Sequence, residues 1–308
     1  MQRNKIHIVY GATASGKTDQ AVRLALAAPD SVIINADSMQ IYKEIPIITN
    51  QPTEEERKGL PHLLFGHRSI TEHSDLTKWL HEVADTINEQ TRLGKKIILV
   101  GGTGMYLKCL IEGVTTIPEI PREVREGIVA QILADGLPVV YDNLIKLDEQ
   151  SQKLKPADTQ RIIRAYEVVL HTGRSIFDWQ KQPNKKFFEI SDFVIHYLNI
   201  SRQKTYEKIN YRFLKMLEWG VAEEAGNAGN IFDKAVLSGK KLSDLPAHKA
   251  HGLRELIAYT KGEMSLEAAI QKAQQVTRNY AKRQLTWWRG WSLGLEKQLE
   301  IVEYEVLS

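Results

Sequence analysis

The sequence is poor in cysteine and has no long apolar run. Its single cysteine, Cys109, excludes an intramolecular disulfide and any zinc site built from several cysteines. No segment approaches the ~20 apolar residues of a membrane helix, and the apolar run near the N-terminus is too short for a signal peptide. The nine histidines match no zinc-binding spacing. We therefore expect a cytoplasmic protein with no membrane partner and no histidine-based metal site.

An excess of charge of one sign is also absent. The 308 residues include 41 Lys and Arg and 38 Asp and Glu, so the net charge of +3 does not by itself indicate a nucleic-acid partner. Hydrophobic residues make up 43% of the chain, which argues against disorder. At ~150 residues per domain, the length predicts about two domains, each with its own core.

Apolar runs alternate with helical patterns in the first part of the chain. Strands and helices are predicted in turn at 6–9, 18–28, 32–34, 75–93, 97–100 and 105–111. This alternation predicts an α/β fold, in which helices flank a parallel sheet and ligands bind at the carboxyl ends of the strands. A strand at 193–200 and a helix at 202–219 bring the chain back to the same fold.

The intervening segment has a different pattern. Beyond Gly113 and two prolines, about 70 residues show helical periodicity with no convincing strand. Helices are predicted at 122–135, 138–147 and 158–172. We therefore predict an α/β core over residues 1–116 and 191–308, and an inserted all-helical subdomain over residues 117–190.

The sharpest motif is GATASGKT at 11–18, which matches the phosphate-loop pattern GxxxxGK[ST] between a predicted strand and helix. Its glycines let successive backbone N–H groups point at one anion, and the following helix directs its positive dipole end there. Lys17 adds a charge, and the Thr18 hydroxyl can bind Mg²⁺. The residues expected to bind phosphate are Gly11, Thr13, Ala14, Ser15, Gly16, Lys17 and Thr18. The motif predicts a P-loop NTPase-like core.

Three other side chains are candidates for the same ligand site. Asp37 ends the second predicted strand, where either a general base or an ordinary turn aspartate is expected. Thr103 lies in a glycine turn after the next strand and could contact a ligand or simply form the turn. Arg212 has the planar guanidinium that suits phosphate, although a solvated basic helix face is the alternative.

The C-terminal part of the chain has a local excess of positive charge that the net charge of the whole chain does not show. Residues 268–295 contain no Asp or Glu but five basic residues and three tryptophans. Basic residues interleaved with aromatic ones suit RNA phosphates and stacked bases, whereas a terminal helix that packs through its tryptophans is the alternative. A second basic pair, Arg161 and Arg164, shares one face of a predicted helix in the inserted subdomain.

In combination, the motifs of the chain resemble those of one family, the bacterial tRNA dimethylallyltransferases, over nearly the whole length. The segments that carry the resemblance are GATASGKT at 11–18, NADSMQIYKEI at 35–45, LPHLLFG at 60–66, LVGGTGMYLKCLIEG at 99–113, PADTQRIIRAYEV at 156–168 and TRNYAKRQLTWWRGW at 277–291. Enzymes of this family transfer a dimethylallyl group from dimethylallyl diphosphate to N6 of adenosine-37 in the tRNA anticodon loop. The resemblance implies a transferase that uses Mg²⁺ and releases pyrophosphate. We expect a monomer.

The resemblance also assigns roles to single positions. The phosphate loop and Arg212 would hold the diphosphate, with Lys17 meeting the charge that develops on the leaving group. Asp37 would be the base that faces the adenine amine, and Thr103 would lie near the point of transfer. The residues that would contact the anticodon stem-loop are Asp37, Ser38, Met39, Gln40, Thr103, Arg125, Gln160, Arg161, Arg164, Lys282 and Arg283.

The chain departs from the family pattern at single positions, such as Ala12 and Lys208, and in two segments. Residues 47–52 lack the usual basic residue, and residues 250–253 read AHGL where isoleucine-glycine-tyrosine is common. Three alternatives stay open from the residues alone. They are a small-molecule P-loop kinase, an isopentenyltransferase that acts on free adenine nucleotides, and a nucleotide-switched RNA-binding protein without transfer chemistry.

Overall fold

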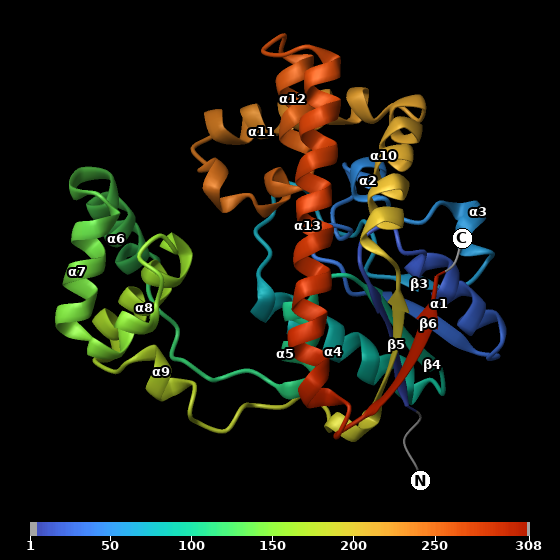
Figure 1. Cartoon of the computed structure of the whole chain (residues 1–308), viewed down its shortest axis with the longest axis horizontal. Helices are drawn as coiled ribbons and strands as arrows, with labels where there is room; N and C mark the ends of the chain where they lie inside the picture. Colours follow the sequence, from blue (N-terminus) through green and yellow to red (C-terminus); the bar gives the residue numbers. More distant parts are fainter. Residues whose placement is uncertain (1–4, 307–308) are drawn as a thin grey trace. The chain divides into compact units, whose positions relative to one another are not determined.

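A six-stranded parallel sheet forms the centre of the α/β part of the chain, in the order β3-β2-β4-β1-β5-β6 (Figure 1). The computed structural model describes residues 5–306, so the predicted core's first four and last two residues lie outside it. The strands are β1 (Ile6–Gly11), β2 (Ser31–Asn35), β3 (His62–Leu63), β4 (Lys96–Gly101), β5 (Phe193–Asn199) and β6 (Glu300–Glu305). In the central strand, Ile8 is fully buried and pairs with Leu99 and Ile195. The predicted α/β fold is confirmed.

Helices surround this sheet. They are α1 (Lys17–Leu26), α2 (Pro46–Thr49), α3 (Glu54–Arg57), α4 (Leu76–Arg92), α5 (Gly104–Glu112), α10 (Arg202–Glu218), α11 (Val221–Leu237), α12 (Leu253–Thr260) and α13 (Leu266–Leu295), with 3₁₀ turns at Ile190–Asp192, Leu242–Asp244 and Pro246–Lys249. In α4, Asp75 caps the first turn by accepting from the Lys78 N–H, and Trp79, Val83 and Ile87 form a buried stripe at four-residue spacing. No helix in the described range has the length and apolar character needed to cross a membrane.

A second apolar core packs α10 to α13 against residues 41–48. The two segments that depart from the family pattern meet in this core. A Cβ built on Gly252 would lie 3.3 Å from the Ile48 Cδ1 and 3.2 Å from the Phe213 ring, and the backbone φ of Gly252 is +92°. A glycine is therefore required there by both the backbone conformation and the close approach.

The helical insertion is a compact unit of its own, formed by residues 112–187. It contains α6 (Arg122–Asp135), α7 (Leu137–Leu147), α8 (Thr159–Thr172) and α9 (Ile176–Trp179), with a 3₁₀ turn at Glu149–Lys153. Ile128, Leu144 and Ile162 are buried in its core. The predicted subdomain, 117–190, overlaps this unit. The backbone N–H groups of Val114 and Lys185 each donate to the other residue's carbonyl. This pairing joins residues 112–116 to the unit.

Candidate active site

The strand order places three loops at one edge of the sheet. Because β2, β4 and β1 are neighbours and parallel, the chain leaves their carboxyl ends as residues 36–40, 102–103 and 12–16. A Cβ built on Gly101 would lie 2.1 Å from the Ala36 carbonyl oxygen, so only glycine allows β4 to approach the neighbouring loop this closely. This packing brings Asp37 and Thr103 to the phosphate loop.

The phosphate loop has the backbone conformation of an anion site. Ala14 and Gly16 have φ values of 64° and 87°, and the Ser15 N–H donates to the Ala12 carbonyl at 3.2 Å. The Lys17 ammonium donates to the same carbonyl at 2.8 Å. The Ser15 hydroxyl is buried and has no hydrogen-bond partner among residues 5–306. A bound phosphate oxygen would supply such a partner.

Two cations and one carboxylate meet at this loop. A guanidinium nitrogen of Arg212, on α10, donates to the Thr13 hydroxyl at 2.7 Å. Burial lowers the pKa of Lys17 to about 8, where Asp37 opposes the shift and Arg212 adds to it. Burial also lowers the pKa of Arg212 to about 10, again against the effect of Asp37. The two positive groups are desolvated and only partly balanced, so the site favours a multiply charged anion.

Asp37 is held in a tight turn. Its Oδ1 accepts from the Met39 N–H at 2.9 Å, and its own N–H donates to the buried Asn35 side chain at 2.9 Å. The Thr103 hydroxyl accepts from the Ser38 N–H at 3.2 Å. The structure therefore brings Asp37, Ser38 and Thr103 together, as the sequence motifs predicted for neighbouring strand ends.

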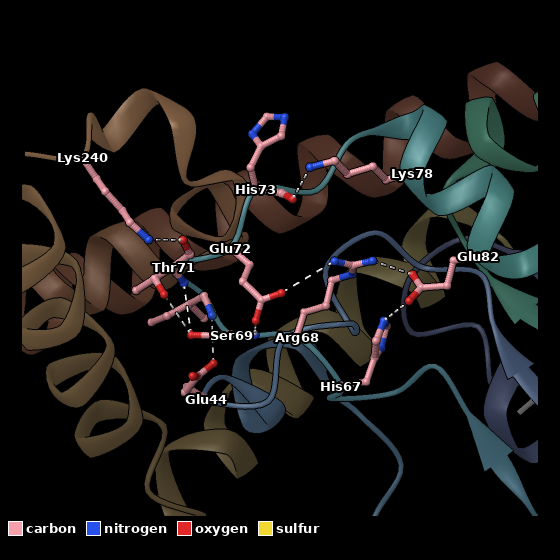
Figure 2. A network of polar contacts seen from close by, with 11 residues as sticks. Glu44, His67, Arg68, Ser69, Thr71, Glu72, His73, Lys78, Glu82 and Lys240 are labelled. Atoms are coloured by element: carbon pink, nitrogen blue, oxygen red, sulfur yellow. Dashed lines mark hydrogen bonds and ion pairs between the residues drawn. The ribbon is translucent and has the colours of Figure 1, made fainter.

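Polar contacts link the segment that follows the Asp37 turn to helix α4 (Figure 2). Arg68 lies between Glu82, at 3.1 Å, and Glu72, at 3.6 Å, while His67 reaches the other oxygen of Glu82 at 2.9 Å. Backbone hydrogen bonds join residues 66–68 to residues 40–43. Glu44 accepts from the Ile70 N–H at 2.9 Å. The segment that follows Asp37 is thus tied to α4 through charged side chains.

Residues 47–50, which belong to the first segment that differs from the family pattern, form the opposite wall of the site. The Glu224 carboxylate, on α11, accepts from the Ile47 and Ile48 N–H groups at 2.7 and 2.8 Å, and burial raises its pKa. The Gln40 amide donates to the Thr49 and Asn50 carbonyls at 3.1 and 2.6 Å. Gln40 therefore holds residues 49 and 50 in place through hydrogen bonds. The sequence motifs predicted a contact of Gln40 with RNA and not this structural role.

Two cavities open between these elements and share Thr13, Asp37, Thr49 and Arg212. The polar cavity, of about 340 Å³, is also lined by Ala14, Gly16, Lys17 and Thr18 of the phosphate loop. The apolar cavity, of about 280 Å³, has its apolar walls formed by Met39, Ile48, Ile209, Phe213, Met216 and Ala250. A ligand with a diphosphate head and a short hydrocarbon tail would fit both sets of walls.

The polar cavity has oxygen donors that suit magnesium. No group of three or more His, Cys, Asp or Glu within residues 5–306 could hold a metal ion. Mg²⁺, however, often takes one or two protein oxygens and completes its shell with water and phosphate. The Thr18 hydroxyl and the carboxylates of Asp19 and Asp37 line the polar cavity, so this donor set fits a phosphate-bound Mg²⁺.

Helix α13 contributes Gln284, which the sequence motifs did not single out, and Tyr280, an aromatic residue of the acid-free stretch. Gln284 is buried, accepts from the Thr13 N–H at 2.8 Å and donates to the Gly102 carbonyl at 2.8 Å. Tyr280, one turn earlier, points its hydroxyl toward the same carbonyl at 3.5 Å, and burial raises its pKa. The signal in the sequence was their i, i+4 spacing within the acid-free stretch.

The outer side of α13, the long orange-to-red helix of Figure 1, carries the predicted RNA contacts. Lys282 and Arg283 are exposed and line a shallow groove with Trp287, which is 38% exposed. Trp288 and Trp291 are buried, and Trp288 stacks on Tyr197 with ring centroids 4.3 Å apart. Two of the three tryptophans therefore anchor the helix, and only Trp287 is available to a stacked base.

The helical unit gathers its own basic residues around a buried acid. Arg125 and Arg164 donate to the two oxygens of Glu167 at 3.0 and 2.7 Å, and Arg125 also reaches the Gln160 amide oxygen at 3.3 Å. Arg161 pairs with Asp158 at 3.4 Å and is 73% exposed. The sequence motifs did not point to Glu167, which holds both guanidinium groups at the surface.

The fold and this site define a class: a parallel α/β protein with a phosphate loop after its central strand and an arginine clamp opposite the loop. The sequence model of the IPP transferase family matches residues 40–291. A tRNA dimethylallyltransferase of Rickettsia bellii (strain OSU 85-389) is 39% identical over 94% of this chain and 89% of its own. That of Wolbachia pipientis wMel is 37% identical over 93% of each chain.

Solved structures of enzymes with similar names also resemble this chain. A eukaryotic dimethylallyltransferase acting on tRNA superposes with a TM-score of 0.79 and 26% identity, covering 97% of this chain and 74% of that one. A tRNA isopentenylpyrophosphate transferase from Bacillus halodurans gives a TM-score of 0.64 and 27% identity, covering 99% and 91%. The chain belongs to the IPP transferase family, as its motifs predicted.

Proposed function

We propose that this chain transfers the dimethylallyl group of dimethylallyl diphosphate to N6 of adenosine-37 in the tRNA anticodon loop and releases pyrophosphate. The observation that carries the proposal is the junction of the two cavities. There, Asp37 faces both the cationic phosphate loop and the apolar walls. Relatives named tRNA dimethylallyltransferase, and a solved relative that acts on tRNA, support the choice of acceptor.

The donor would lie across both cavities. Its diphosphate accepts hydrogen bonds from the loop N–H groups and from Lys17 and Arg212, whose charges balance the charge that grows on the leaving oxygen. Mg²⁺ bound through Thr18 would supply further neutralisation of the diphosphate. The five-carbon tail then lies against the apolar walls, where water is excluded.

The transfer forms one bond and breaks one. The N6 lone pair attacks the first carbon of the dimethylallyl group as that carbon's bond to the diphosphate oxygen breaks. The electron pair of the broken bond leaves with pyrophosphate, and the N6 proton passes to the Asp37 carboxylate. The adenine must first leave the base stack, which costs a few kcal/mol and least in a single-stranded loop.

The RNA itself would be bound by the two basic surfaces. Lys282 and Arg283 on α13 suit phosphates beside the active site, and Arg125, Arg161 and Arg164 form the basic surface of the helical unit. We propose that the protein acts as a cytoplasmic monomer.

The test is transfer of label from dimethylallyl diphosphate in the presence of Mg²⁺. Unmodified tRNA, AMP and ATP serve as parallel acceptors. The proposal expects label in tRNA, and digestion should place it on the adenosine next to the anticodon. Label in AMP but not in tRNA, or transfer of the γ-phosphate of ATP, would contradict it.

A further inference from the structure

His251 stands in the wall of the apolar cavity, together with Asp37, Ser38 and Thr103. It precedes Gly252, the residue that caps α12 in the left-handed conformation. Its ring centroid lies 4.3 Å from that of Tyr280, with an angle of 43° between the planes. The Arg283 guanidinium carbon lies 5.7 Å from the centroid of the same tyrosine ring. A series of planar side chains therefore leads from the exposed Arg283 through Tyr280 to the cavity.

The surroundings of the His251 imidazole favour its neutral form. Burial lowers its pKa, the Arg283 charge lowers it further, and Asp37 opposes the shift. Lys249 also lines this cavity. A neutral imidazole presents one N–H donor and one lone-pair acceptor on a single flat ring.

An extruded purine needs both kinds of contact. Its faces need aromatic or apolar surfaces, and its edge needs hydrogen-bond partners that replace those lost from water. Ile209, Phe213 and Met216, against which the five-carbon tail would lie, offer no polar partner for the ring nitrogens. His251 supplies that partner beside the carboxylate that would accept the N6 proton.

From this arrangement we infer that His251 is a recognition residue for the acceptor purine. Its imidazole bonds a ring nitrogen of the adenine, while the Tyr280 ring supports the base and N6 is turned toward Asp37. The inference rests on the proposed function, because it names a partner for the base that the enzyme modifies.

The test uses the full-length protein and anticodon stem-loop RNAs that carry 1-deaza-, 3-deaza- or 7-deazaadenosine at the acceptor position. In the native protein, one of these changes should lower kcat/KM for RNA by about 10- to 100-fold, since one hydrogen bond is lost. His251→Phe should lower kcat/KM for normal RNA by a similar factor and leave the Kd for dimethylallyl diphosphate unchanged. The sensitive deaza position should have no further effect in that variant, because the two changes remove the same contact.

A structural role for His251 would give a different result. His251→Phe would then lower the activity toward all four RNAs by the same factor, and this outcome would overturn the inference. Native kcat/KM in His251→Phe would also overturn it. If His251→Phe does not fold, His251→Leu carries the same test, since its side chain has neither a donor nor an acceptor. His81→Phe, at an exposed position of α4, is the matched control.

The design separates this inference from the proposed function. If the native protein modified AMP instead of tRNA, the proposed function would fail. The same series of deaza-nucleotides would then still test whether His251 contacts the purine ring.

Discussion

The His7 and His196 rings lie side by side in the sheet, with His7 Nδ1 2.9 Å from His196 Nε2. His196 Nδ1 in turn lies 3.0 Å from the Tyr304 hydroxyl, so one chain of side chains links β1, β5 and β6. Burial lowers the pKa of His196 to about 4, and the neighbouring His7 adds to the shift. Burial lowers the pKa of His7 too, where Glu300 opposes the shift and Lys96 adds to it.

This pair should make stability depend on pH. Between pH 6.5, the usual pKa of histidine, and about pH 4, the unfolded chain binds more protons than the folded one. The free energy of unfolding should therefore fall as the pH falls through this window, by up to about 1.4 kcal/mol per pH unit for the His196 imidazole. Urea unfolding at several pH values measures this slope. His196→Phe should flatten the slope; a slope equal to that of the native protein would contradict the assignment.

Gln284 should be needed for an ordered phosphate loop. Gln284→Leu leaves the Thr13 N–H and the Gly102 carbonyl without their partner, which should lower the free energy of unfolding by about 1–3 kcal/mol. Calorimetric titration with pyrophosphate should show roughly tenfold weaker binding, because the loop is less preorganised. Gln275→Leu removes an exposed amide from the same helix and is the control. Native affinity in Gln284→Leu would show that the loop keeps its shape alone.

Asp37→Asn should abolish transfer while leaving both substrates bound. The amide oxygen can still accept from the Met39 N–H, so the turn is kept, but the group no longer accepts a proton. The single-turnover rate should fall about 100- to 10,000-fold, with the affinities for tRNA and pyrophosphate within a small factor of native. Asp85→Asn, exposed on α4, controls for the loss of one charge. Loss of tRNA binding with the chemistry intact would assign Asp37 to recognition instead.

The outer face of α13 should contribute to RNA affinity through charge. Replacing both Lys282 and Arg283 with Ala should weaken tRNA binding and reduce the slope of log affinity against log salt by about one to two. Lys234→Ala with Lys241→Ala removes the same charge from exposed positions of the α/β unit outside α13 and should change the slope little. An unchanged slope in the Lys282 and Arg283 variant would leave this face with a structural role.

The strands and helices that the sequence could predict are those with a strong local signal. The helices of the insertion are an example, since Asp158 caps the start of α8 and Gly173 ends it. In contrast, β3 has two residues, and three of the six residues of the edge strand β6 are glutamates, so neither shows the apolar run of a buried strand. Both strands form because a neighbouring strand already offers its backbone groups.

The sequence by itself determined the phosphate loop, because its glycines and Lys17 lie within eight consecutive residues and their backbone conformation is local. It also placed Asp37 and Thr103 at strand ends. The tertiary structure alone decided what completes the site. Thr13 meets Arg212 across 199 residues of chain and Gln284 across 271. Which face of α10 or α13 turns toward the loop depends on the packing of the whole α/β unit, and no local pattern encodes it.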